Sequence, residues 1–314
     1  MEYIKDFEWK PKITCSELVE QLKSVGFQSI ELGKVSEIIY KMKKENVKTI
    51  LSFTSNLGTS GLRGLFAQLI KLHMVDILIT TAGAIEEDIM KALGEKFLIS
   101  RFDADDIELH EKGMNRVGNI IITNDSYVRF EGFMRKLLEE IIKEKRKLSG
   151  VEFFRIIGSK LNDEKSFLYQ AYKNNVPIYC PAITDGSIGF QLFLAKQDYK
   201  DFVIDVVEDF RDIITRLSYD EKKGLIALGG GTSKHYALLS ALVSGGFDYA
   251  VYVTTSSQFS GSMSGATTKE AKSWGKVKDD SDSITVLGDA TIIFPIAISY
   301  ALDKLYNEGL IKIE

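Results

Sequence analysis

Cysteine is almost absent from this sequence. Only Cys15 and Cys180 occur among 314 residues, far apart and without a second ligand spaced as in a zinc motif. The composition therefore predicts neither a disulfide framework nor a metal site, and it fits a reducing, intracellular setting. Proline is scarce as well, with four residues, and we find no Pro-rich linker, no low-complexity tract and no fixed-period repeat.

An excess of positive charge is also missing. The formal net charge is −4, and the basic residues scatter among acidic ones, so the footprint of a nucleic-acid binder is absent while a cationic substrate would meet mild attraction. The first nine residues include three acidic ones and no apolar core, so we expect no signal peptide. Since the longest apolar run, Ala290 to Leu302, is too short to cross a bilayer, we predict a cytoplasmic protein without membrane contact.

The order of apolar and polar stretches is typical of an α/β protein. Thr14 followed by Glu17 forms a capping box, which predicts a first helix inside a short N-terminal helical segment of about residues 1–46. Further on, we expect strands at 47–53, 75–80, 120–123, 176–180, 224–228, 249–254 and 284–287, and helices at 62–72, 85–93, 130–143, 165–174 and from Lys234. Continuous apolar strands between helices predict a parallel sheet covered on both faces, in one domain over residues 1–314.

One segment interrupts this rhythm. Residues 101–119 are polar, acid-rich and without a clear period, and we interpret them as an insertion or a subunit contact.

Small and polar residues follow six of the predicted strands. These loops are TSNLGTSG (54–61), TTAGAIEED (80–88), PAITDGSIG (181–189), GGGTSKH (229–235), TTSSQFSGSMSG (254–265) and GDAT (288–291). Ligands of open parallel sheets bind outside the carboxyl ends of the strands, so six such loops at one edge would form a polar cleft suited to a dinucleotide. Each loop taken alone can equally be a tight turn or a helix N-cap. Neither a P-loop nor a GxGxxG fingerprint is present.

Read together, several motifs resemble those of deoxyhypusine synthases, in the same order and at the family's spacings. They are FTSNLGTSGLRG, VDILITTAGAIEEDI, GMNRVGN, AYKNNVPIYCPAITDGS, GGGTSKH and EAKSWGK, and the resemblance runs from about Trp9 to the last helix. It implies a Rossmann-like α/β fold and a homotetramer whose paired active sites lie at dimer interfaces, with NAD held by residues of both subunits.

The resemblance also implies a reaction. NAD takes a hydride from spermidine, a lysine attacks the resulting imine, and the aminobutyl group passes to a lysine of translation initiation factor 5A. Lys276 in SWGK matches the nucleophile, and His235 matches a histidine that accepts a proton from the substrate amine. Without the resemblance, Lys276 would be read as a solvated charge and His235 as an ordinary helix N-terminal residue.

Two further sets of residues carry over from the family. Those that match its NAD contacts are Ser55, Asn56, Thr59, Thr81, Ala82, Gly83, Glu87, Asp185, Thr255, Ser256, Asp289 and Ala290. Those that match its substrate contacts are Glu86, Glu87, Gly230, His235, Gly261, Ser262, Glu270 and Trp274. Carboxylates suit ribose hydroxyls and backbone N–H groups suit a pyrophosphate, although acidic residues also favour the start of any helix.

The sequence departs from the family where a polyamine would be anchored. Phe190, Ser260 and Met263 stand where eukaryotic-type members carry Asp, and Leu239 replaces an Asn. The chain is therefore similar to divergent, archaeal-looking members. Alternatives left open are a paralogue that transfers an aminobutyl group from or to another amine, as in homospermidine formation, and a catalytically weak NAD-binding homologue.

Overall fold

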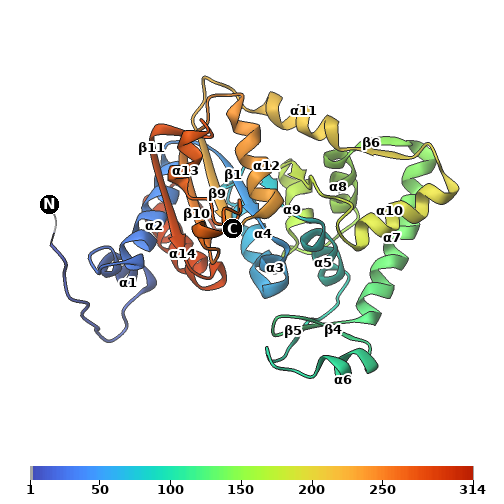
Figure 1. The fold of residues 1–314 in the computed structure, drawn as a ribbon, viewed down its shortest axis with the longest axis horizontal. Helices are drawn as coiled ribbons and strands as arrows, with labels where there is room; N and C mark the ends of the chain where they lie inside the picture. The colour runs from blue at the N-terminus through green and yellow to red at the C-terminus, as the bar shows by residue number, and fades with distance from the viewer. Residues whose placement is uncertain (1–2, 314) are drawn as a thin grey trace. The chain divides into compact units, whose positions relative to one another are not determined.

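The structure, a computed structural model, describes residues 3–313. Its residues form two compact units, each assembled from separate segments of the chain (Figure 1). The first unit contains the described residues up to Phe53, Leu72–Ile79 and the described residues from Arg211 onward. The second contains Thr54–Lys71 and Thr80–Phe210. The prediction of a single domain over the whole chain stays a prediction.

Parallel strands form the centre of the first unit, side by side in the order β11-β10-β9-β1-β2. They are β1 (Lys48–Phe53), β2 (Ile77–Ile79), β9 (Lys223–Leu228), β10 (Phe247–Thr254) and β11 (Val277–Leu287). The register of β1 on β9 is continuous from Lys48 opposite Lys223 to Phe53 opposite Leu228. Ile50 and Val251 are fully buried, as expected for strands covered on both faces. The predicted α/β fold with a parallel sheet is confirmed.

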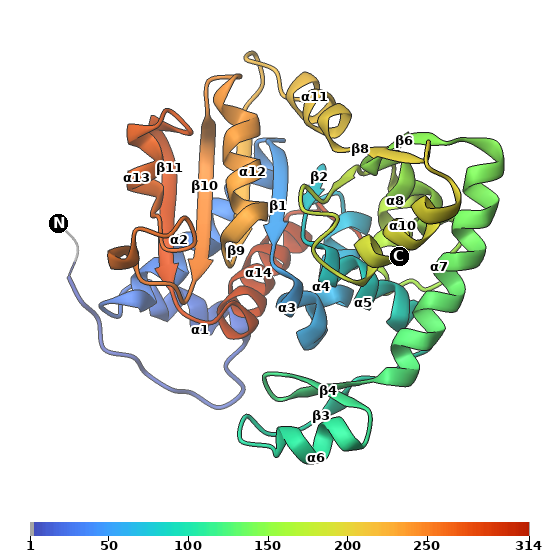
Figure 2. The ribbon, with the colours of Figure 1, turned by 45° about the vertical axis from the view of Figure 1, so that its right-hand side comes forward.

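Helices cover both faces of this sheet. The helices of the first unit are α1 (Cys15–Leu22), α2 (Gln28–Lys44), α12 (Gly231–Leu242), α13 (Thr268–Ser273) and α14 (Ala290–Asn307), with the 3-10 turn η2 (Gln258–Ser260). On one face α12 contacts β1 and β9, while on the other α2 and α14 pack together and contact β10 (Figure 2). The capping box predicted at Thr14 and Glu17 is present at the start of α1.

The second unit is mostly helical. Its helices are α3 (Ser55–Leu57), α4 (Arg63–Lys71), α5 (Ala82–Ala92), α6 (Asp106–Glu111), α7 (Asn124–Glu144), α8 (Gly150–Ser159), α9 (Phe167–Asn174) and α10 (Ser187–Asp198), with a π-helical turn η1 (Gly58–Leu62). Its strands are β3 (Leu98–Ile99), β4 (Met114–Val117), β5 (Ile120–Thr123), β6 (Lys147–Ser149), β7 (Ile178–Tyr179) and β8 (Val203–Asp205). Helix α11 (Val206–Arg216) begins in the second unit and ends in the first.

Two predictions for the second unit need correction. Residues 120–123 were predicted as a strand of the parallel sheet, but β5 pairs antiparallel with β3 and β4. The segment 101–119, interpreted as an insertion or a subunit contact because it has no clear period, contains α6 and β4, and β4 is a strand of that small sheet (Figure 1). An aliphatic run is compatible with either strand direction, so the sequence pattern could not decide. Likewise, TSNLGTSG was expected as a loop but is helical in α3 and η1.

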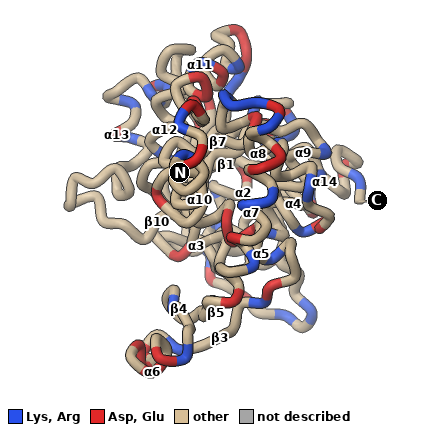
Figure 3. The backbone as a smooth tube through the Cα atoms, turned by 90° about the vertical axis from the view of Figure 1, so that its right-hand side faces the viewer, with Lys and Arg blue, Asp and Glu red and all other residues tan. Residues whose placement is uncertain are grey.

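Charged residues of both signs alternate along the chain, and Figure 3 shows Lys and Arg interspersed with Asp and Glu. Within residues 3–313, no helix combines the length and the apolar character that crossing a lipid bilayer requires.

Candidate active site

The predicted nucleophile, Lys276, lies in the first unit at the turn between α13 and β11. Gly275 has a φ of +67°, a left-handed conformation that glycine adopts without steric cost. Gly246 allows a close approach here, because a Cβ on it would lie 2.7 Å from the Gly275 carbonyl oxygen. The two glycines thus let the chain reverse tightly and bring Lys276 into the protein.

The Lys276 side chain is buried, with 7% of the residue exposed. Its Nζ lies 5.2 Å from the centre of the Trp274 ring, within the range of a cation–π contact. Among residues 3–313, no carboxylate forms an ion pair with this amine. Trp274 itself is 66% exposed, so its ring forms an open wall beside the amine.

His235 lies in the same unit, near the beginning of α12. His235 is exposed to solvent, and the partial desolvation of its ring, followed by the positive charge of Lys276, lowers its pKa. The imidazole and the amine are therefore close enough to interact electrostatically. The structure brings together the two residues for which a catalytic role was predicted.

Glycines and serines of the first unit pack the 255–266 loop against α12. A Cβ on Gly230 would lie 2.4 Å from Ser264 Cα, so only glycine fits there. The backbone N–H of Gly231 donates to Ser264 Oγ at 2.9 Å, and Thr254 Oγ1 donates to the Ser264 carbonyl at 3.2 Å. This loop carries the predicted substrate residues Gly261 and Ser262, both exposed, and leads to α13, where the exposed Glu270 follows.

The predicted cofactor residues of the first unit lie where β10 and β11 end. Thr255 and Ser256 line a hollow of about 420 Å³, together with Phe259, Leu287 and Gly288 among others. Asp289 caps α14, because its Oδ1 accepts from the Thr291 N–H at 2.7 Å, and Ala290 is the first residue of that helix. One oxygen of Asp289 is thus already used inside the protein.

The predicted residues of the second unit gather around the start of α5. The Thr59 hydroxyl lies between the Glu87 carboxyl group and the Ser55 carbonyl oxygen, which is 3.1 Å away. Burial raises the pKa of Glu87 to about 7, with the nearby charge of Glu86 adding to the effect. A protonated Glu87 can donate to Thr59 while Thr59 donates to Ser55, so both hydrogen bonds are satisfied. Asn56, next to Ser55, accepts from the Thr54 hydroxyl at 2.6 Å.

Glu86 joins α5 to the turn before α10. Its Oε2 accepts from the Ile188 N–H at 3.0 Å, and burial raises its pKa despite this bond, with Asp185 contributing in the same direction. A Cβ on Gly186 would lie 3.0 Å from both Ala82 Cβ and Glu86 Oε2. The TDGS motif therefore needs glycine for space, and it holds Asp185 beside Glu86.

The N-terminus of α5 has the properties of an anion site. Its N-cap residue, Thr81, makes no capping hydrogen bond with its side chain, and the buried Thr81 Oγ1 has no partner among the residues that the structure describes. A Cβ on Gly83 would lie 2.9 Å from Ser55 Cβ. An uncapped helix N-terminus with an unused hydroxyl can bind a phosphate group. The residues predicted for NAD in this unit therefore fit a phosphate-bearing ligand.

Asp88, the last acid of TTAGAIEED, has a role that the motif did not reveal. Its carboxylate accepts from Arg63 Nε at 2.6 Å, from Ser166 Oγ at 2.7 Å and from the Leu168 N–H at 3.0 Å. Arg63 also pairs with Asp163 at 2.7 Å. Asp88 is fully buried, so it holds α4, α5 and the start of α9 together and is not available to a ligand.

Three further residues or regions stand out beyond the predicted site. Lys234, directly before His235, is 1% exposed, and burial lowers its pKa to about 8. Tyr127 on α7 lies near Glu86 and Glu87, and its burial raises its pKa to about 12.

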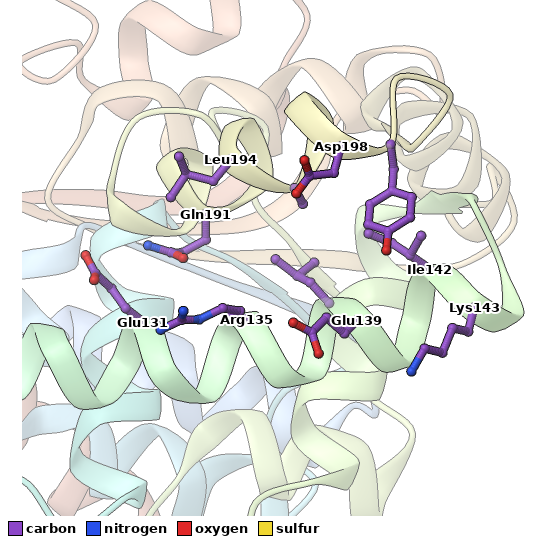
Figure 4. A pocket seen from close by; sticks show the side chains of 11 residues that line it. Glu131, Arg135, Glu139, Ile142, Lys143, Gln191, Leu194 and Asp198 are labelled. Carbon is purple, nitrogen blue, oxygen red and sulfur yellow. The ribbon is translucent and has the colours of Figure 1, made fainter.

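A hollow of about 530 Å³ lies between α7 and α10. Its lining includes charged side chains of both signs, such as Glu131, Arg135 and Glu139 (Figure 4), and none of the predicted site residues line it.

The residues that depart from the family are distributed over both units. In the second unit, Phe190 is 53% exposed and stacks on Phe193 with ring centres 5.9 Å apart. In the first unit, Ser260 Oγ donates to the Ser257 carbonyl at 3.1 Å, and Met263 and Leu239 are half-buried. None of these side chains offers a carboxylate to a polyamine.

Comparisons with known proteins show the family of the chain. Residues 17–301 match the family model described as deoxyhypusine synthase. A probable deoxyhypusine synthase from the archaeon Pyrococcus abyssi is 39% identical over 308 residues, covering 92% of each chain, and the deoxyhypusine synthase of Senecio vernalis is 34% identical over 326 residues, covering 94% of this chain and 88% of the relative. A solved structure of a candidate deoxyhypusine synthase from Entamoeba histolytica has a TM-score of 0.68 at 27% identity, covering 96% of this chain and 97% of that one. This chain is an enzyme of the deoxyhypusine synthase family.

Proposed function

We propose that the chain is an NAD-dependent transferase that moves the 4-aminobutyl group of spermidine to a lysine of translation initiation factor 5A. The observation that carries the proposal is the buried Lys276, which lacks a carboxylate partner among residues 3–313 and lies within electrostatic range of His235. An amine buried in this way is available for bonding instead of being held in an ion pair.

Lys276 is the proposed carrier of the transferred group. Its Nζ would form a bond to the imine carbon of oxidised spermidine, and 1,3-diaminopropane would leave. The aminobutyl group would remain on Lys276 as an imine until the acceptor lysine displaces it. Since the pKa of His235 is lowered, its imidazole is neutral at pH 7 and can accept a proton from the substrate amine.

NAD is the proposed cofactor, and when bound it would accept a hydride from the amine donor and return it to the transferred group. The uncapped N-terminus of α5, with the unused Thr81 hydroxyl and Gly83, supports phosphate binding there. Thr255 and Ser256 in the hollow of the first unit would contribute further contacts. Glu86 and Glu87 would receive the cationic ends of the substrate, because a carboxyl group buried without a charged partner gains most from a cation.

A trapping experiment tests this proposal. The protein is incubated with NAD and spermidine labelled in the butyl portion, and the mixture is reduced with borohydride. We expect the label on the peptide that contains Lys276, and we expect Lys276→Arg to lose it together with more than about a thousandfold of the turnover rate. Lys272→Arg is the matched control, because Lys272 lies four residues earlier and its Nζ donates to the Asp279 carbonyl at 2.8 Å.

The identity of the molecule that accepts the aminobutyl group distinguishes the proposed function from its nearest alternative. With factor 5A present, we expect its lysine to gain the mass of an aminobutyl group. The apolar Phe190 and Met263 favour a second candidate, in which a free diamine is the acceptor, and transfer to putrescine with none to the factor would establish it. A folded, NAD-loaded protein that takes no label at Lys276 would refute both and indicate a catalytically weak homologue.

A further inference from the structure

Lys234 is a buried lysine whose amine donates hydrogen bonds to backbone carbonyl oxygens. Its Nζ donates to the Ala266 carbonyl at 2.6 Å and to the Met263 carbonyl at 3.1 Å, and it lies 4.3 Å from the centre of the Tyr252 ring. No salt bridge joins Lys234 to a carboxylate within residues 3–313. The amine is therefore held by the backbone of the 255–266 loop and by the face of one aromatic ring.

Burying a lysine in this way is costly, because the charged form loses its water. Burial lowers the pKa of Lys234 to about 8, although the charge of Glu270 partly opposes the shift. A methionine would fill the same space without this cost. What the lysine adds is a set of N–H donors aimed at two carbonyls of one loop.

The two carbonyls enclose the end of the loop that leads into the reactive segment. Met263 directly follows Gly261 and Ser262, which were predicted to contact the substrate, and Ala266 precedes Thr267, the N-cap of α13. From α13 the chain continues to Trp274 and Lys276. A shift of the loop at these carbonyls would therefore be passed to both the substrate residues and the nucleophile.

Lys234 adds to the other contacts at this end of the loop, which include a hydrogen bond from the Ala266 N–H to the Met263 carbonyl at 3.3 Å. Ser264 is fixed by Gly231 and Thr254, whereas Met263 and Ala266 share Lys234 as their side-chain hydrogen-bond donor within the described residues. Because Lys234 precedes His235 on α12, the same turn of helix carries the predicted proton acceptor and the residue that holds the loop. Lys234 therefore links the turn of α12 that carries His235 to the loop.

We propose that Lys234 is a positioning residue that fixes the 255–266 loop for binding of the amine donor. The proposal rests on the proposed function for its consequence in catalysis, but the contact between Lys234 and the loop can be tested without it. The side chain is buried behind the loop, so it acts through the loop and not on the substrate.

Lys223 provides a matched control. It is also fully buried in the first unit, and its Nζ donates to the carbonyls of Ser218 and Glu221 at 2.7 and 3.0 Å. It lies at the amino end of β9, whereas Gly230 and α12 follow the carboxyl end. Replacing either lysine with Met removes one buried amine and two bonds to carbonyls.

The experiment compares Lys234→Met with Lys223→Met by hydrogen–deuterium exchange and by kinetics. We expect Lys234→Met to raise exchange in peptides covering 255–267 by about tenfold and to raise the KM for spermidine by a similar factor, with a smaller change in kcat. Lys223→Met should change neither the exchange of the loop nor the KM, although we expect it to melt at a lower temperature than the wild type. Lys234→Arg, which keeps the donors, should recover part of the KM.

The outcomes separate the two proposals. Unchanged exchange at 255–267 in a folded Lys234→Met protein, or an equal rise in Lys223→Met, overturns the positioning role. Raised exchange at the loop in Lys234→Met, together with a wild type that has no transferase activity, would leave the positioning contact in place and refute the proposed function instead. Raised exchange with an unchanged KM in an active enzyme overturns the role in donor binding.

Discussion

The carboxyl groups of Glu86 and Glu87 are adjacent and buried, with 6% and 7% of each residue exposed. Two carboxylates so close to each other cannot both ionise without cost. Burial and the neighbouring charge of Glu86 raise the pKa of Glu87 to about 7. About half of the Glu87 carboxyl groups are therefore neutral at pH 7.

The raised pKa of Glu87 predicts how stability depends on pH. The folded state binds a proton at Glu87 that the unfolded state releases near pH 4.5, so the free energy of unfolding falls as pH rises from about 4.5 to about 7. The contribution of Glu87 to this fall is about 3 kcal/mol. Glu87→Gln removes it, so the stability difference between wild type and variant, measured by urea unfolding, should shift by that amount across this range.

Glu140→Gln is the control for this titration. The hydrogen bond from Lys160 lowers the pKa of Glu140 below its ordinary value, so its contribution is lost only as the pH falls below about 4.5. Between pH 5 and pH 7 the effect of this variant should be constant. An equally constant effect of Glu87→Gln would contradict the assignment of a neutral carboxyl group to Glu87.

Several helices of the second unit depend on one carboxylate. Asp88 on α5 accepts hydrogen bonds from Arg63 on α4 and from Ser166 and Leu168 at the start of α9. Removing one charge of a buried pair costs about 3–5 kcal/mol when the other charge is left uncompensated, and because Asp163 still pairs with Arg63, the lower end of this range applies. We therefore expect Asp88→Asn to lower the free energy of unfolding by about 3 kcal/mol.

Asp163→Asn is the control for Asp88→Asn, because it removes one ion pair of Arg63 and leaves the hydrogen bonds of Asp88 in place. Asp163 contacts the same Arg63, but 24% of its side chain is exposed, so water can replace part of the interaction and the loss should stay near 1 kcal/mol. Both free energies follow from chemical denaturation with circular dichroism. Equal effects of the two variants would show that Asp88 does not bridge the helices.

The patterns of apolar and polar residues predicted the central strands well, but they predicted the first and last residues of some elements less well. The strands 224–228 and 249–254 and the helix 165–174 were predicted within a few residues, because buried runs and helical periodicity are local signals. The strand 284–287 was predicted short, since β11 begins at Val277 with exposed residues such as Asp279 and Asp280 that lack a strand pattern. The two residues Gly118 and Asn119 between β4 and β5 are a hairpin signal that was overlooked.

Site residues could be predicted from the sequence only where they belong to a motif that resembles the family. SWGK indicated Lys276, and the structure places it near His235. The roles of Lys234 and Asp88 depend on which carbonyls and donors come close in space, and no spacing along the chain encodes that. Both would have been read as surface charges, because lysine and aspartate are rarely fully buried.

At the scale of the whole molecule, the resemblance predicts a homotetramer with residues of two subunits in each site. Light scattering should then give a mass near four times the 35.2 kDa of the chain. Lys276 belongs to the first unit and Glu87 to the second, so the two positions can be inactivated in separate chains. Such chains can test the sharing of sites directly.

Mixing Lys276→Ala with Glu87→Ala protein, after denaturation and joint refolding, should restore activity. If each site takes Lys276 from one subunit and Glu87 from its neighbour, half of the pairs formed are mixed and each contains one intact site, giving about a quarter of the wild-type activity. Each variant refolded alone is the control and should stay inactive. No recovery in mixed tetramers would show that one chain supplies both residues.

The interleaving of the two units has a consequence for how the protein is made. As the ribosome releases the chain, the second unit has all its residues once Phe210 has emerged, whereas the first still waits for β9, β10 and β11. Until then β1 can pair with β2 but has no β9 beside it, so one edge of the strand and its apolar residues stay exposed. Premature stop codons in the last third of the gene should therefore yield aggregating fragments instead of a smaller working enzyme.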